Sequence, residues 1–127
     1  MKHKTATLEG ALLDAAVAKA LGWKVTRDPE EQGGGLDALD VQAQRGHILS
    51  DESSGWSPSR QWEDGGPIIE RERIDLLWLD AARGWSANFE IHVGQGEEEH
   101  RHTGPTPLIA AMRAYVASRF GDEVELP

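Results

Sequence analysis

The spacing of apolar residues predicts a helix near the N-terminus. Between Leu8 and Leu21 the apolar positions Leu13, Ala16, Val17 and Ala20 follow the i, i+3, i+4, i+7 pattern of one helix face. Thr7 precedes this segment as a possible N-cap, and Gly22 follows it where a helix commonly ends. We therefore expect an amphipathic helix over residues 8–21.

A second helix is predicted near the C-terminus. Thr106 is a candidate N-cap, Pro107 suits the first helical position, and Gly121 is a natural stop. Four apolar residues fall on one face of this helix, which we interpret as a face packed on the core: Ile109, Met112, Val116 and Phe120.

The middle of the chain predicts a β-hairpin over about residues 75–93. Residues 75–79 are mostly apolar, and from Trp85 to Val93 apolar and polar residues alternate with the period of a half-buried strand. A lone hairpin is only marginally stable, so helices or a further strand must cover it. The candidates for that strand are residues 23–26 and 41–49.

These elements predict one α+β domain spanning residues 1–127, since a chain of 127 residues closes a single core. A small antiparallel sheet is covered by the N-terminal and C-terminal helices. Three polar, glycine-rich segments, about 27–35, 50–55 and 94–104, are expected to be mobile loops.

The charge excludes one class of partner. The chain carries 13 Lys and Arg against 22 Asp and Glu, a formal net charge of −9, and has no basic cluster, so we expect no nucleic-acid partner.

The chain has no run of about 18 apolar residues and no signal-peptide pattern, which predicts no membrane partner. It also contains no cysteine. We therefore expect a cytoplasmic protein.

The segment "GWSPSRQWEDGGPIIER", residues 55–71, is the most distinctive in the chain. Gly65-Gly66-Pro67 is expected to open a short helix over 67–73, whose free N–H groups would attract anions beside stacking indole rings. The predicted pocket for a small, flat, anionic molecule comprises Trp56, Ser57, Ser59, Arg60, Trp62, Gly65 and Gly66. The alternative is that the two indoles pin the loop onto the hairpin, with Arg60 stacked across them.

Metal binding has weaker candidates. His92, His100 and His102 lie in a segment rich in glutamate and could together ligate a divalent ion. Solvated side chains are the ordinary outcome in such a segment. We therefore predict no metal and no cofactor.

Enzymatic motifs are absent from the sequence: there is no GxSxG, P-loop, GxGxxG or HExxH pattern. Glu63, Asp64 and Glu70 flank the aromatic segment and could serve acid–base chemistry, but their spacing does not distinguish them from surface acids. Whether the protein is an enzyme stays open, with the balance against catalysis.

Three blocks resemble the NinX-like family of tailed-phage and prophage proteins: "LEGALLDAAVAKALG", "WSPSRQWEDGGPIIERERI" and "GPTPLIAAMRAYVASRFGDEVELP". The family's aromatic-Ser-Pro-Ser, Trp and Gly-Gly-Pro pattern carries over onto Trp56, Ser57, Pro58, Ser59, Trp62, Gly65, Gly66 and Pro67. The segments "EEQGGGLDALD" and "GEEEHRH" depart from it. The resemblance implies a small phage accessory protein expressed in the bacterial host, without an assigned reaction.

Three functions therefore remain open. The first is a non-enzymatic protein that binds a small anionic ligand, such as a nucleotide derivative, and sequesters it against host defence, with a homo-oligomer as one option. The second is a protein-interaction module that binds or inhibits a host protein. The third is a small hydrolase of a nucleotide-like ligand.

Overall fold

The computed structural model describes residues 1–27, 35–50, 55–93 and 96–127, and for 89–93 and 96–100 it describes the backbone alone. The elements run in the order β1 (Lys2–Lys4), a 3-10 turn η1 (Thr5–Thr7), α1 (Gly10–Ala20), β2 (Lys24–Arg27), β3 (Leu36–Asp40), β4 (Arg45–Leu49), α2 (Trp62–Glu72), β5 (Asp75–Asp80), β6 (Gly84–Val93), β7 (Gly96–Gly104), α3 (Pro107–Phe120) and β8 (Glu123–Glu125). The fold is α+β, as the sequence predicts.

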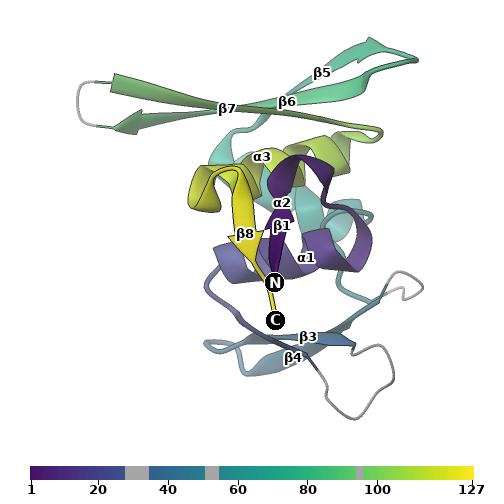
Figure 1. Ribbon diagram of the computed structural model, residues 1–127, viewed down its shortest axis with the longest axis vertical. Coiled ribbons are helices and arrows are strands. Elements are labelled where there is room, and N and C mark those ends of the chain that lie inside the picture. Colours follow the sequence, from purple (N-terminus) through teal and green to yellow (C-terminus); the bar gives the residue numbers. More distant parts are fainter. Residues whose placement is uncertain (28–34, 51–54, 94–95) are drawn as a thin grey trace.

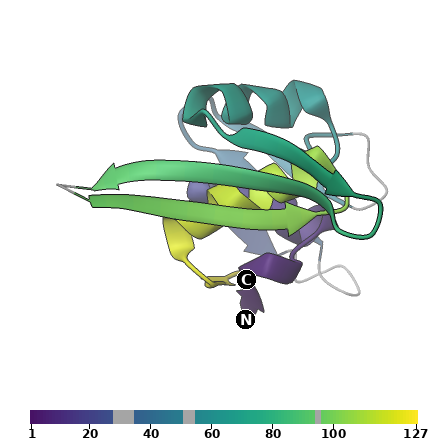
Figure 2. The same ribbon diagram turned by 90° about the horizontal axis from the view of Figure 1, so that it is seen from above.

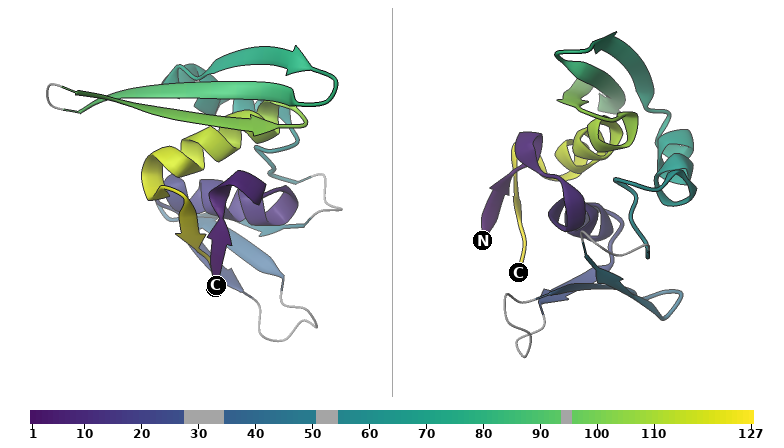
Figure 3. Two further views of the ribbon diagram at one scale, coloured as in Figure 1. Left: turned by 45° about the horizontal axis from the view of Figure 1, so that its top comes forward. Right: turned by 90° about the vertical axis from the view of Figure 1, so that its right-hand side faces the viewer.

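The helices lie between two antiparallel sheets (Figure 1). One sheet has the strand order β5-β6-β7 and packs on α3, and the other has the order β2-β3-β4 and packs on α1. The helices α1 and α3 contact each other in the middle layer (Figure 3). Strands β1 and β8 pair antiparallel, so the two chain ends lie side by side.

The predicted N-terminal helix is confirmed, with a later start. It begins at Gly10 rather than Leu8, and the Thr7 hydroxyl donates to the Lys4 carbonyl instead of capping the helix. Its end is as expected, because Gly22 takes a φ of +86°, a conformation that glycine adopts without steric cost. Leu8 and Glu9 lie between the η1 turn and the start of α1.

The C-terminal helix α3 follows its local signals closely. The Thr106 hydroxyl accepts a 3.1 Å hydrogen bond from the Ile109 N–H, and Gly121 ends the helix at a φ of +80°. The prediction of one apolar face was too narrow, because every residue from 110 to 117 is buried. Packing against α1, α2 and the β5-β6-β7 sheet covers this helix on several sides.

The predicted hairpin is confirmed as β5 and β6, with Leu77 opposite Ser86 and Trp78 opposite Trp85. Its third strand is β7, a segment that we expected to be part of a loop over 94–104. Residues 97–103 lack apolar alternation, so their pairing with β6 through the backbone left no hydrophobic signal. Seen from above, β6 and β7 extend past the helices (Figure 2).

The other two strand candidates belong to a different sheet. Residues 23–26 overlap β2 and residues 41–49 include β4, and both strands pair with β3 rather than with the hairpin. Residues 28–34 and 51–54, within the two other expected loops, lie outside the described residues.

The helix α2 also begins earlier than predicted, at Trp62 instead of Pro67. Glu63 and Asp64 occupy its first turn, where carboxylates interact favourably with the helix dipole. Pro67 therefore lies inside the helix, where it cannot donate to the Glu63 carbonyl.

Candidate functional site

The segment with the expected ligand site is anchored to α1 by a buried carboxylate. The Asp14 side chain accepts a 2.6 Å hydrogen bond from the Ser57 hydroxyl and a 2.9 Å hydrogen bond from the Ser59 N–H. The Arg60 guanidinium lies 3.6 Å from the same carboxylate. Burial raises the pKa of Asp14, although these hydrogen bonds and the Arg60 charge act in the opposite direction.

Further contacts hold this segment against α2. The Ser57 N–H donates to the Asp64 carboxylate at 2.9 Å, and Arg60 Nε donates to the Ser57 hydroxyl at 2.9 Å. A Cβ added to Gly65 would collide with the Pro58 carbonyl oxygen, so only glycine fits where α2 crosses the loop. The polar groups of Ser57 and the N–H of Ser59 thus serve the fold.

The two tryptophans of this segment have different surroundings. Trp56 packs on Trp23 at a ring-centroid distance of 4.6 Å and on His47 of β4 at 5.8 Å. Trp62 is 54% exposed at the start of α2. Trp56 therefore pins the loop onto the β2-β3-β4 sheet and not onto the hairpin, whereas Trp62 has an accessible ring. Binding of an anion at this segment stays a prediction.

The metal hypothesis falls mostly outside the described side chains. His102 stands opposite Ala87 in the β6–β7 register, but the side chains of His92 and His100 are not described. Within the described side chains, no group of three or more His, Asp or Glu could hold a metal ion.

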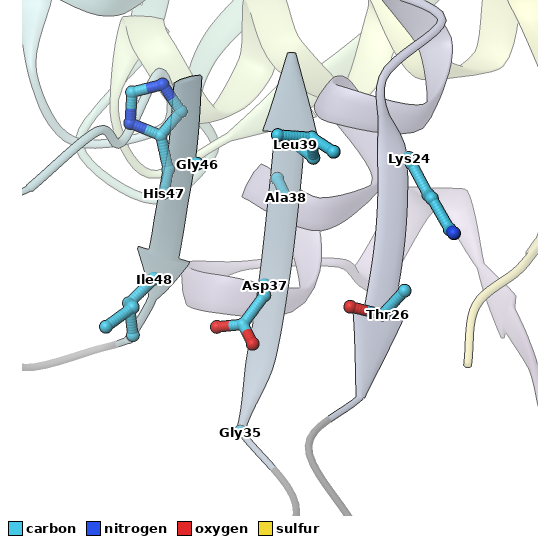
Figure 4. A pocket seen from close by; sticks show the side chains of 9 residues that line it. All are labelled: Lys24, Thr26, Gly35, Asp37, Ala38, Leu39, Gly46, His47 and Ile48. Atoms are coloured by element: carbon cyan, nitrogen blue, oxygen red, sulfur yellow. The ribbon is translucent and has the colours of Figure 1, made fainter. Parts of the chain in front are cut away.

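The outer face of the β2-β3-β4 sheet carries an open hollow of about 450 Å³ (Figure 4). Lys24 and Asp37 contribute opposite charges, and Gly46 leaves space beside the apolar Leu39. Ile48, at its border, is 73% exposed. Lys24 and Thr26 are exposed and Asp37 is half-buried, whereas the half-buried His47 packs on Trp23 and Trp56. The hollow is therefore an open surface, and none of its polar lining residues is fully buried.

A second hollow, of about 360 Å³, lies where the hairpin turn meets the start of α3. Its walls come from Trp78 of β5, residues 81–84 of the turn, residues 103–105 and Arg113 of α3. We call it the Arg113 pocket. It differs from the hollow over β2-β3-β4 because one of its lining groups is a buried cation.

Arg113 is only 8% exposed. Its Nε donates to the Leu8 carbonyl at 2.8 Å and its Nη1 to the Thr103 carbonyl at 2.9 Å. Among the residues that the structure describes, Nη2 has no hydrogen-bond partner and the guanidinium forms no ion pair. Burial lowers the pKa of Arg113, and the Glu9 carboxylate partly offsets this effect.

Such an arrangement is unusual, because buried charges in proteins are generally paired. The backbone carbonyls that Arg113 contacts carry partial negative charge but no compensating full charge. A guanidinium in this setting can bind a carboxylate or phosphate through charge-assisted hydrogen bonds.

The remaining walls of the pocket are formed by the Trp78 indole and by closely packed backbone at Gly84 and Gly104. Trp78 is 52% exposed, and its ring meets Trp85 edge to face at a centroid distance of 5.5 Å. A Cβ on Gly84 would collide with the Gly104 carbonyl oxygen, and a Cβ on Gly104 would lie 2.7 Å from the Ala110 nitrogen. The pocket therefore combines an exposed indole, a backbone wall and a buried cation.

The sequence interpretation missed this pocket. A usable signal was present, since Arg113 is the single charged residue among the apolar positions of "LIAAMRAYVA". The apolar spacing of that segment indicates a face packed on the core and does not show where the guanidinium lies.

Comparison with known families identifies the chain's relatives. A family model described as bacteriophage P22 NinX matches residues 4–119. The chain belongs to this family. This family match is consistent with a phage accessory protein. The matched range includes both the segment anchored by Asp14 and the Arg113 pocket of this NinX-family protein.

No curated protein matches the chain. In the described part of this NinX-family protein, none of the helices has the length and apolar character that crossing a membrane requires.

Proposed function

We propose that this NinX-family protein is a non-enzymatic binding protein that holds a small anion in the Arg113 pocket. The observation that carries the proposal is the guanidinium of Arg113, which is 8% exposed and forms no ion pair within the described residues. An anion in the pocket would place a counter-charge in direct contact with the guanidinium, in addition to the Coulombic effect of the Glu9 carboxylate.

The energetics favour a small anion over a neutral ligand. An unpaired buried charge typically costs several kcal/mol, and pairing it recovers part of that cost. The net charge of −9 repels anions at long range. That repulsion is screened beyond about 8 Å at physiological ionic strength, whereas contact with Nη2 would occur at about 3 Å.

The lining of the pocket supports binding over catalysis. General acid–base chemistry requires a positioned carboxylate, histidine or comparable group. The described residues that line the pocket include no Asp, Glu or His. We therefore propose that the ligand is stored unchanged, as in sequestration of a host defence signal, rather than hydrolysed.

Isothermal titration with inorganic phosphate tests the site. Ala82 is exposed at the rim of the pocket, so Ala82→Glu would place a carboxylate near the anion and should weaken phosphate binding at least about ten-fold. Ala6→Glu makes the same charge change at an exposed position in η1 and serves as the matched control. Equal binding by both variants, or no binding by the parent protein at millimolar phosphate, would contradict the proposal.

Storage and hydrolysis are distinguished by the fate of the ligand. The protein is isolated from infected cells, and the small molecules released on denaturation are compared by mass with those in the same cell extract. We expect a species of unchanged mass that the Ala82→Glu variant fails to retain. Recovery of only a hydrolysed product would support an enzyme.

A second candidate function is binding to a host protein. It is favoured by the exposed apolar side chains on the open face of the β2-β3-β4 sheet, Leu39 at 40% and Ile48 at 73% exposure. Recovery of one stoichiometric protein from bacterial lysate should then be lost in Ile48→Asp and kept in Ala82→Glu. Recovery that does not depend on Ile48 would exclude this surface.

A further inference from the structure

We infer that the ligand of the Arg113 pocket carries a flat aromatic ring system next to its anionic group, as a nucleoside monophosphate does. This inference rests on the proposed function, because it names the class of anion that the same pocket takes. It follows from the placement of Trp78 and Arg113 in one hollow and from the size of that hollow.

Trp78 offers an aromatic surface inside the pocket. It lies on the edge strand β5 and is 52% exposed, although a large apolar ring gains free energy from burial. Trp85 holds the Trp78 ring in one orientation through an edge-to-face contact with an interplanar angle of 63°. A planar group that stacks on such a ring typically gains about 1–3 kcal/mol.

The distribution of charge in the pocket matches a ligand with two dissimilar ends. Trp78 and Arg113 line the same hollow from different elements, one from the sheet and one from α3. Arg83 also lines it, but its Nε donates to the Asp80 carboxylate at 2.7 Å, so its charge is already balanced. Among the described lining residues, Arg113 is the buried cation without an ion pair, and Trp78 offers the stacking surface.

The volume of the pocket limits the size of this ligand. A volume of about 360 Å³ is near the lower end of the range of about 300–1,000 Å³ for small-molecule sites. This favours one base, one sugar and one phosphate over a dinucleotide. Gly84 and Gly104 pack closely against neighbouring protein atoms, so the backbone between the turn and α3 closes this side of the hollow.

Three probes separate the anion from the aromatic ring: inorganic phosphate, ribose 5-phosphate and AMP. With the full-length protein, we expect AMP to bind at least about ten-fold more tightly than ribose 5-phosphate, since stacking supplies the difference. Trp78→Leu keeps apolar bulk beside Trp85 and removes the indole. It should reduce AMP affinity to the level of ribose 5-phosphate and change the affinity for phosphate less than about two-fold.

Trp62→Leu is the matched control, because Trp62 is 54% exposed and does not line this pocket. It should leave all three affinities unchanged. Circular dichroism and a thermal melt establish that both variants are folded, and Trp78→Phe, which should bind AMP with intermediate affinity, gives a second reading if Trp78→Leu unfolds.

The outcomes distinguish the two proposals. Equal binding of AMP and ribose 5-phosphate would overturn the aromatic inference and leave the anion site standing. Failure of all three probes to bind would overturn both proposals. Loss of AMP binding in Trp62→Leu but not in Trp78→Leu would move the ligand to the Trp56–Gly66 segment and overturn the Arg113 pocket.

Discussion

The Ser57 hydroxyl donates a 2.6 Å hydrogen bond to the buried Asp14 carboxylate, across 43 residues of sequence. This contact fixes the loop before α2 to the first helix of the fold. It also gives two polar groups of the Ser-Pro-Ser motif a structural role, since the Ser57 hydroxyl and the Ser59 N–H both donate to α1.

Removal of the Asp14 carboxylate should destabilise the fold. Asp14→Ala leaves the Ser57 hydroxyl and the Ser59 N–H buried without their acceptor, at a cost of about 2–4 kcal/mol in the free energy of unfolding. Urea denaturation measures the loss. Asp75→Ala removes an exposed carboxylate from β5 and should change stability by less than about 0.5 kcal/mol. Equal effects of the two substitutions would contradict the anchoring role.

The same carboxylate should give stability a defined pH dependence. Its pKa in the folded protein is raised above the ordinary value of 3.8, mainly by burial. At pH values between 3.8 and the raised pKa, the folded state binds more protons than the unfolded state. The contribution of Asp14 to the free energy of unfolding is therefore fully present below pH 3.8 and is lost as the pH rises through the pKa of the folded state.

Asp14→Asn does not titrate, and it therefore isolates this contribution. The stability of the parent protein minus that of Asp14→Asn should decrease as the pH rises from 3.8 toward neutrality. Urea unfolding of both proteins across a pH series measures the difference. A difference that stays constant or increases over this range would show that Asp14 is not destabilised by its burial.

Gly104 should tolerate no side chain. A Cβ at this position would lie 2.7 Å from the Ala110 nitrogen and 2.9 Å from Ile109 Cγ2, so Gly104→Ala must push α3 away from β7. We expect a loss of about 1–3 kcal/mol, measured as a lower melting temperature. Gly46→Ala is the control, because nothing lies within 4 Å of its added Cβ, and its stability should stay within about 0.5 kcal/mol of the parent.

Thr106 and Thr7 should respond differently to truncation. Thr106→Ala removes the N-cap hydrogen bond to Ile109 and should cost about 1 kcal/mol. Thr7→Ala removes only an exposed hydrogen bond to the Lys4 carbonyl, so its effect should be smaller. Chemical denaturation of the two variants compares them directly. A larger effect at Thr7 would restore it as the cap that the sequence alone suggested.

The sequence predicts those helices and strands whose formation depends on residues close together in the chain. Thr106, Pro107 and Gly121 act within α3 itself, and the alternation from Trp85 to Val93 arises within β6, so both elements could be predicted. Strand β7 could not, since its polar residues pair through the backbone with β6. Hydrophobic periodicity contains no information about such pairing.

The contacts of the candidate site also join residues far apart in the chain, which sequence patterns do not show. Ser57 and Ser59 lie close together in sequence, but the carboxylate that they bind comes from α1. Arg113 meets carbonyls that lie 105 and 10 residues away in sequence. No spacing rule relates these positions. The sequence therefore predicted a ligand site at the aromatic segment, residues 56–62, and gave no comparable signal for the surroundings of Arg113.

The most direct test of the Arg113 pocket is an NMR titration of the full-length protein with AMP. Our account predicts that the Trp78 indole N–H, the Arg113 side-chain N–H and the backbone amides of 81–84, 103 and 104 shift together with a single saturating dependence on AMP. The Trp62 indole N–H should not move. Shifts confined to Trp62 and residues 56–66, or no saturable shift at millimolar AMP, would contradict the account.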